Sequence, residues 1–157
     1  MEIHTDFKEL LELFSIRSPQ YNKHKVEYLI VGGYALAFHG APRFTGDIDL
    51  FVRPVSENAR RILDTLDEFG FGSLDLSEDD FTTPGQVIQL GVPPICIDII
   101  TRVGGVSWEK ANLSKFSGQY DQTPVFFIGR EDFITNKKAT GRKKDAAEIG
   151  PLVSNNQ

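Results

Sequence analysis

The chain has 157 residues, of which 40% are hydrophobic and 25% are charged, and its formal net charge is −5. This length and composition are typical of one globular domain. They exclude a disordered chain, a membrane-spanning helix of about 20 apolar residues, and strong attraction of the whole protein to nucleic acid. The single cysteine, Cys96, excludes an intrachain disulfide and a cysteine-rich zinc site, and because no secretory signal begins the chain we expect a cytoplasmic protein.

In the first half of the chain, the hydrophobic pattern predicts three helices and two strands. Apolar residues either recur at helical spacing or form short runs rich in β-branched and aromatic residues. We expect helices over residues 6–16, 34–38 and 56–69, and strands over residues 26–31 and 47–52. Gly32-Gly33 separates the first strand from the helix after it, and Gly40-Ala41-Pro42 ends that helix.

The second half begins with an acidic segment, residues 70–85, that we expect to be irregular. We then expect a hairpin of strands 87–90 and 95–101, a short helix over 108–113, a strand over 124–128, and helices over 130–140 and 144–153. Because helices and strands do not alternate strictly, this order predicts an α+β (mixed α/β) fold with a mixed central β-sheet flanked by helices. We expect a single domain over residues 1–153 and a polar tail over 154–157.

The residues with the clearest chemical interpretation lie between the first two predicted strands. Gly32-Gly33 precedes a predicted helix, where the backbone can approach a ligand closely and unpaired N–H groups can bind phosphate. A tight turn without a ligand is the alternative interpretation, and the spacing matches neither a P-loop nor a dinucleotide-binding motif.

Asp47 and Asp49 are two residues apart on a predicted strand, so their side chains point to the same face. Carboxylates held this close repel each other unless a cation lies between them, and such oxygen ligands favour Mg²⁺ or Mn²⁺. Two solvated aspartates at the start of a strand are the alternative.

Asp98 is the only charged residue of the apolar run ICIDII. If it is buried there, it needs a metal, a cation or a strong hydrogen-bond donor, because an unpaired buried carboxylate is costly. An exposed position on an edge strand is the alternative.

Basic residues are concentrated near the C-terminus, where six lie between Arg130 and Lys144 against two acidic residues. This local excess of positive charge favours a small anionic ligand, although a solvated helix face is the alternative. We interpret His39 as structural, Cys96 as a packing residue, and the acidic cluster from Asp75 to Asp80 as a solvated loop.

Three features of the sequence together resemble the nucleotidyltransferase superfamily of the DNA polymerase β type. They are the Gly-Gly pair, an Asp-x-Asp pair thirteen residues later, and a third aspartate in a later strand. More locally, three segments are similar to minimal nucleotidyltransferases related to abortive-infection (toxin–antitoxin) proteins: YLIVGGYALAFHGAPRFTGDIDLFV, IDII and ITNKKATGRKKDAAEI. The resemblance spans nearly the whole chain and implies the nucleotidyltransferase fold.

The resemblance also implies a two-metal mechanism. Asp47 and Asp49 would bind two divalent ions, Mg²⁺ or Mn²⁺, and Asp98 would complete the site of one of them and assist deprotonation of the acceptor. Lys137 would neutralise the pyrophosphate that leaves, with an ion pair to Asp145 as the alternative for Lys137 and Arg142. The residues expected to bind the nucleotide are Gly32, Gly33, Arg43, Thr45, Lys137 and Arg142.

The activity implied is transfer of a nucleoside monophosphate from a nucleoside triphosphate to an acceptor hydroxyl on a tRNA, a protein or a small molecule. Little chain is left to bind the acceptor, so we expect a homodimer or a cognate toxin or antitoxin partner, in a toxin–antitoxin or phage-defence system. A non-catalytic nucleotide sensor and an antitoxin-like interaction partner remain alternatives on the same fold.

Overall fold

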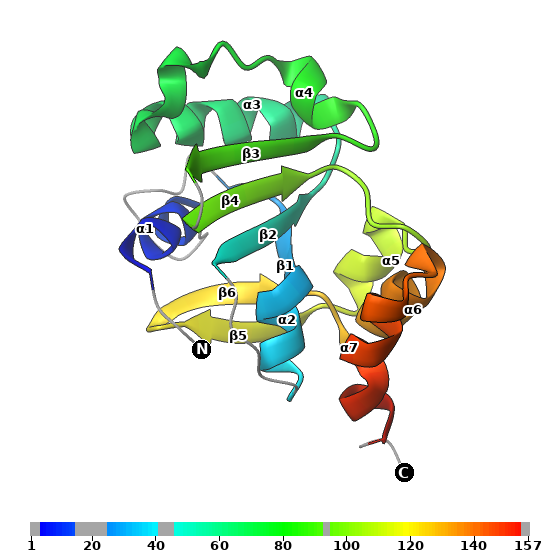
Figure 1. Cartoon of the computed structure of the whole chain (residues 1–157). Helices are drawn as coiled ribbons and strands as arrows, with labels where there is room; N and C mark the ends of the chain where they lie inside the picture. The colour runs from blue at the N-terminus through cyan, green and yellow to red at the C-terminus, as the bar shows by residue number, and fades with distance from the viewer. Residues whose placement is uncertain (1–3, 15–24, 41–45, 93–94, 155–157) are drawn as a thin grey trace.

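The computed structural model describes residues 4–14, 25–40, 46–92 and 95–154 and is built around a six-stranded mixed sheet (Figure 1). The strands are β1 (Tyr28–Val31), β2 (Asp47–Val52), β3 (Val87–Val92), β4 (Ile95–Ile100), β5 (Phe116–Tyr120) and β6 (Thr123–Phe127). Their order in the sheet is β3-β4-β2-β1-β6-β5. β2 pairs in parallel with β4, and β1 with β6, while the other neighbours are antiparallel. The predicted mixed α+β class is therefore confirmed.

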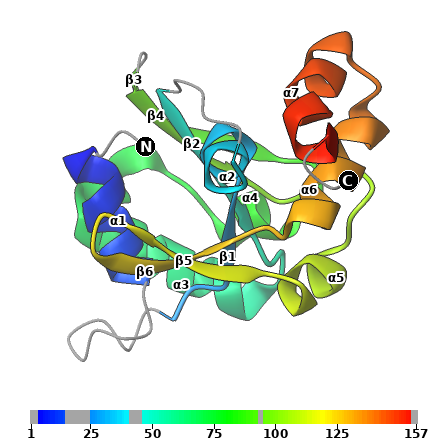
Figure 2. The same ribbon diagram turned by 90° about the horizontal axis from the view of Figure 1, so that it is seen from below.

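Helices cover both faces of this sheet, with α2 and α3 on opposite sides (Figures 1 and 2). The helices are α1 (Thr5–Phe14), α2 (Gly32–Phe38), α3 (Ser56–Leu66), α4 (Glu78–Thr82), α5 (Trp108–Leu113), α6 (Arg130–Thr140) and α7 (Lys143–Ser154). Within the ranges that the structure describes, no helix combines the length and the apolar character needed to cross a membrane.

Burial in the core explains why the sequences of the central strands are mostly apolar. All four residues of β1 are buried, because β1 has a neighbouring strand on each side and helices above and below. Leu29 and Ile30 are fully buried, and each contributes about 1.5–3 kcal/mol relative to an exposed position. The central sheet is therefore a rigid base for side chains that β1, β2 and β4 carry.

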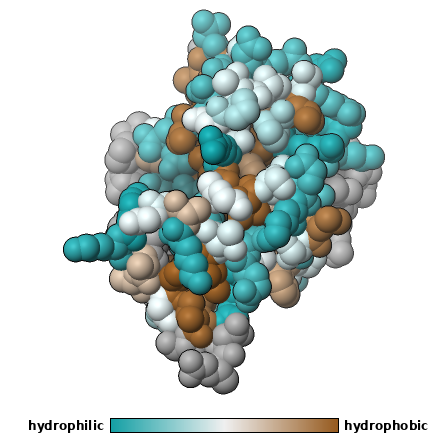
Figure 3. Space-filling model, turned by 90° about the vertical axis from the view of Figure 1, so that its right-hand side faces the viewer, coloured by the Kyte–Doolittle hydropathy of each residue, from teal (hydrophilic) through white to brown (hydrophobic). Residues whose placement is uncertain are grey.

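The C-terminal helices form one side of the molecule. Figure 3 shows this side as mostly polar, with apolar side chains gathered in its lower part, toward the C-terminal end of the chain. Gly141, between α6 and α7, has a left-handed backbone (φ +67°), so the predicted break between the two helices is confirmed.

Four expectations about elements need correction. The acidic segment 70–85 is not irregular throughout, since it contains α4, which Ser77 and Asp80 cap reciprocally. Helix α2 begins at Gly32, two residues before its predicted start. The regular part of α3 ends at Leu66, and the chain continues as a π-helical segment (Asp67–Phe71) and a short 3₁₀ turn (Gly72–Leu74). Strand β5 was not predicted, because its sequence FSGQY shows no apolar alternation.

Candidate active site

Two aspartates lie directly opposite each other on the parallel strands β2 and β4. Asp49 is in register with Asp98, and Asp47 with Cys96. Because side chains alternate along a strand, Asp47, Asp49 and Asp98 all project from the same face of the sheet. Ile48 and Leu50, between and beyond the β2 aspartates, are fully buried on the other face. The alternation predicted for this strand is confirmed, and Asp98 lies next to the edge strand rather than on it.

Asp49 is in a strongly unfavourable environment for a carboxylate. Burial raises its pKa to about 7, and the charges of Asp98 and Asp47 and a side-chain hydrogen bond with Asp98 act in the same direction. Asp98 Oδ1 is buried and has no hydrogen-bond partner among the described residues. Asp49 and Asp98 therefore carry more negative charge than nearby positive groups offset, and an acceptor oxygen for which the described residues provide no donor.

Gly32 brings the start of α2 against the carboxylate of Asp49. Its neighbour Val31 pairs with Asp49 across β1 and β2, so the chain leaves β1 directly beside this side chain. A Cβ atom on Gly32 would lie 2.0 Å from Asp49 Oδ2, and Gly32 also has a left-handed φ of +67°. Both observations require glycine at this position.

Lys137 supplies positive charge to the same region. It lies on α6, with its ammonium nitrogen 5.5 Å from the centroid of the Phe133 ring, and its charge opposes the rise in the pKa of Asp49. Arg142 is exposed and follows the break at Gly141. Arg43 and Thr45, and the side chain of Asp145, lie outside the described residues.

Comparison with known proteins gives a fold and no closer relationship. No family model matches the chain, and no curated protein matches it. Among solved structures, the chain is similar to a protein from Thermotoga maritima assigned as a nucleotidyltransferase, with a TM-score of 0.61 and 14% identity over 98% of this chain and 96% of that one. The chain has the nucleotidyltransferase fold.

Two further structures with this fold are antibiotic-related. The lincosamide antibiotic adenylyltransferase LnuA, solved with lincomycin bound, has a TM-score of 0.53 and 13% identity over 98% of this chain and 99% of that one. The antibiotic-resistance factor ANT(2'')-Ia has a TM-score of 0.54 and 16% identity over 94% of this chain and 74% of that one. At these identities the likeness establishes the nucleotidyltransferase fold alone.

The carboxylates on this nucleotidyltransferase fold suit a divalent cation chemically but do not form a finished cluster. Among the described residues, no three histidine, cysteine or acidic side chains are grouped closely enough to hold a metal ion as they stand. The donor set is nevertheless all oxygen, Asp98 Oδ1 has no hydrogen-bond partner in the described part of the chain, and a cation would offset the burial and the carboxylate repulsion that raise the pKa of Asp49. Asp47, Asp49 and Asp98 therefore offer the donor chemistry of a Mg²⁺ or Mn²⁺ site, without the close grouping of three ligands that a finished site has.

Cys96 and His39 make structural contacts near the aspartates and at the end of α2, respectively. Cys96 is buried beside Asp47, and burial together with the charges of Asp47 and Asp98 raises the pKa of its thiol, which keeps it protonated. The ring nitrogen Nε2 of His39 lies 2.7 Å from the carbonyl oxygen of Ile128, which ties the end of α2 to the end of β6. The role of Gly32 against Asp49 was not predicted, because it depends on the register between β1 and β2.

Proposed function

We propose that the chain is a metal-dependent nucleotidyltransferase, which transfers a nucleoside monophosphate from a nucleoside triphosphate to an acceptor hydroxyl. The observation that carries this proposal is the pairing of Asp49 with Asp98 on neighbouring strands of a nucleotidyltransferase fold, where Asp98 Oδ1 is buried and has no hydrogen-bond partner among the described residues. A structural role alone would not favour two facing carboxylates, because each raises the cost of ionising the other.

In the proposed reaction, the acceptor oxygen forms a bond to the α-phosphorus, the bond from that phosphorus to the pyrophosphate oxygen breaks, and the hydroxyl proton leaves. Asp47, Asp49 and Asp98 would hold two divalent ions, which when bound activate the acceptor hydroxyl and stabilise the triphosphate and leaving group. Asp98 also offers a carboxylate oxygen that can accept the proton.

The remaining residues would bind and neutralise the nucleotide. Lys137, whose charge already acts on Asp49, would offset the negative charge that develops on the pyrophosphate. Gly32 and Gly33 begin α2 and would offer backbone N–H groups to the phosphates. Arg43, Thr45 and Arg142 complete the proposed nucleotide-binding set.

We take a small hydroxyl-bearing molecule as the first acceptor class to test. Two proteins with the same fold are described as an antibiotic-resistance factor and a lincosamide adenylyltransferase, and the second is matched over nearly its whole length. Transfer to tRNA or to a partner protein, as in a toxin–antitoxin or phage-defence system, is the competing outcome of the same experiment.

The experiment is label transfer from each α-³²P-labelled ribonucleoside triphosphate, with Mg²⁺ or Mn²⁺, into the RNA, protein and small-molecule fractions of a cell extract. We expect label in one fraction, lost in Asp49→Asn and retained in Asp79→Asn, which removes an exposed acid of α4. Metal-dependent nucleotide binding without label in any fraction would indicate a nucleotide sensor, and absence of both would refute the assignment of the three aspartates.

A further inference from the structure

A cavity lies on the aspartate-bearing face of the sheet but at the other end of β2. Its volume is about 500 Å³, within the range of small-molecule sites. It is enclosed by the end of β2, by Pro84, and by the segment that leads from β4 into α5. The alternation that places Asp47 and Asp49 on one face continues to Phe51, about 7 Å beyond Asp49, and Arg53 follows the end of the strand. Asp47, Asp49, Asp98 and Lys137 do not line this cavity.

The walls of the cavity combine apolar surface with two arginines. Phe51 and Trp108 contact each other edge to face, with ring centroids 5.2 Å apart, and both line the cavity. Arg53 and Arg102 line it too, and the acidic side chain among the lining residues is Glu109. Such a lining fits a molecule with a flat apolar part and a negatively charged group.

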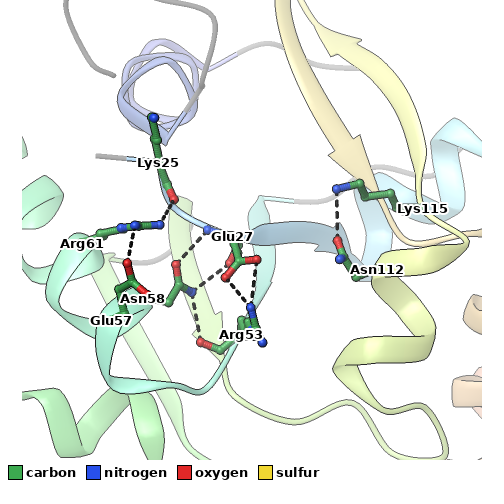
Figure 4. Close-up of polar contacts among 8 residues, drawn as sticks. All are labelled: Lys25, Glu27, Arg53, Glu57, Asn58, Arg61, Asn112 and Lys115. Carbon is green, nitrogen blue, oxygen red and sulfur yellow. Dashed lines mark hydrogen bonds and ion pairs between the residues drawn. The ribbon is translucent and has the colours of Figure 1, made fainter. Parts of the chain in front are cut away.

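Arg53 is held in place by a network of polar contacts with Glu27 and Asn58 (Figure 4). Its Nη1 lies 3.2 Å from Glu27 Oε2, and the buried side-chain amide of Asn58 donates to the carbonyl oxygens of Arg53 and Glu27. Nevertheless, Nε of Arg53 is buried and has no hydrogen-bond partner among the described residues. The network therefore orients the guanidinium and leaves part of its donor capacity unused.

Arg102 is exposed, and no ion pair or hydrogen bond of its side chain is found among the described residues. The segment that carries it is nonetheless firmly anchored. Asn136 of α6 donates to the carbonyl oxygen of Gly104 at 2.9 Å, and Gly105, with φ +80°, packs against Ala139. One wall of the cavity is thus fixed against α6, while the nearby charge of Arg102 is available to a ligand.

We propose that this cavity binds a small organic anion, whose carboxylate or phosphate is held by Arg102 and Arg53 and whose apolar part contacts Trp108 and Phe51. The site is separate from the proposed transferase site and does not depend on it. Trp108 is the only tryptophan of the chain, so its fluorescence reports directly on occupation of the cavity.

The test is titration of the protein with phenyl phosphate, phenylacetate and uncharged benzyl alcohol, followed by Trp108 emission and by calorimetry. We expect saturable binding of at least one anion and none of benzyl alcohol, and the two anions distinguish a phosphate from a carboxylate ligand. Arg102→Gln should weaken binding at least tenfold, and Val55→Phe, which fills the cavity from its rim, should abolish it.

Lys115→Gln is the matched control, because it removes one positive charge from a residue that does not line the cavity and instead contacts Asn112 (Figure 4). It should change the affinity less than twofold. The proposal is overturned if neither anion binds, if Arg102→Gln and Lys115→Gln weaken binding equally, or if Asp49→Asn abolishes binding, which would place the probe among the aspartates.

Discussion

Replacement of Gly32 by alanine tests whether the close approach of α2 to Asp49 is needed for nucleotide binding. The added Cβ would lie 2.0 Å from Asp49 Oδ2 and 2.9 Å from Cγ, whereas real Cβ contacts essentially never fall below 3.0 Å. The carboxylate must therefore retreat by about 1 Å, and a displacement of about 1 Å at a reacting group can cost about 100-fold in activity. We expect metal-dependent binding of a nucleoside triphosphate to weaken about 10–100-fold, the range typical when the groups that position a metal ligand are altered.

Gly141→Ala provides a matched control for backbone strain. Gly141 has the same φ of +67°, but a Cβ atom there would meet nothing within 4 Å. Both substitutions should lower the free energy of unfolding by about 1–2 kcal/mol, because alanine is strained in the left-handed region. Only Gly32→Ala should also displace Asp49.

The assay combines urea unfolding of both variants with calorimetric titration of each ribonucleoside triphosphate in the presence of Mg²⁺. The nucleotide affinity of Gly141→Ala should stay within about threefold of the unchanged protein, well below the factor of 10 that corresponds to 1.4 kcal/mol. If Gly32→Ala binds nucleotide as well as Gly141→Ala does, the position of Asp49 against α2 is irrelevant and the reasoning fails.

Three further results are expected. Asp98→Asn should abolish metal-dependent nucleotide binding. Without metal, it should raise the free energy of unfolding by about 1 kcal/mol, because it removes the repulsion with Asp49. A loss of stability in urea denaturation would contradict this. Lys137→Met should weaken triphosphate binding about tenfold in calorimetry, whereas Lys138→Met on the same helix should not. Burial and the charge of Arg130 lower the pKa of His39, so the unfolded state takes up this proton first and the contribution of His39 to stability should fall as pH decreases from 7 to 5, while the raised pKa of Asp49 acts in the opposite direction. In pH-dependent unfolding, the stability of His39→Gln relative to the unchanged protein should therefore increase from pH 7 to 5, and a constant difference would contradict this.

Most of the central sheet could be predicted from the sequence, because each of its central strands buries at least one face in the core. β1, β2 and β4 contain apolar runs whose character follows from burial, and the hairpin of β3 and β4 is confirmed. The pattern is least informative where a strand buries little. β5 lies at the sheet edge, and of its residues only Tyr120 is fully buried.

Gly118 explains why β5 carries no apolar alternation. A Cβ there would lie 2.8 Å from the Phe127 ring and 2.9 Å from the Phe38 ring, which stack on each other at 4.2 Å. Gly118 therefore lets the Phe127 and Phe38 rings pack against the strand. Because glycine has no side chain, the sequence shows no apolar residue at this packed position. Helix α4 carried a readable signal in Ser77 and Asp80, since this spacing is typical of a capping box.

The site residues on β2 and β4 could be chosen from the sequence, but their mutual arrangement could not. Asp-x-Asp on a strand fixes that two side chains share a face, whereas the pairing of Asp49 with Asp98 requires the register of β2 against β4. The register of β1 against β2 places Gly32 against Asp49. Long-range pairing of this kind leaves no local pattern in a single sequence.

The measurement that tests the central claim most directly is Mn²⁺ binding, followed by electron paramagnetic resonance, in the presence of a non-hydrolysable nucleoside triphosphate. The account predicts tight binding that Asp49→Asn and Asp98→Asn each weaken at least tenfold and that Asp79→Asn, on α4, leaves unchanged. If Asp49→Asn and Asp98→Asn bind Mn²⁺ and nucleotide as tightly as the unchanged protein, the facing carboxylates are not a metal site and the proposed transferase mechanism is wrong.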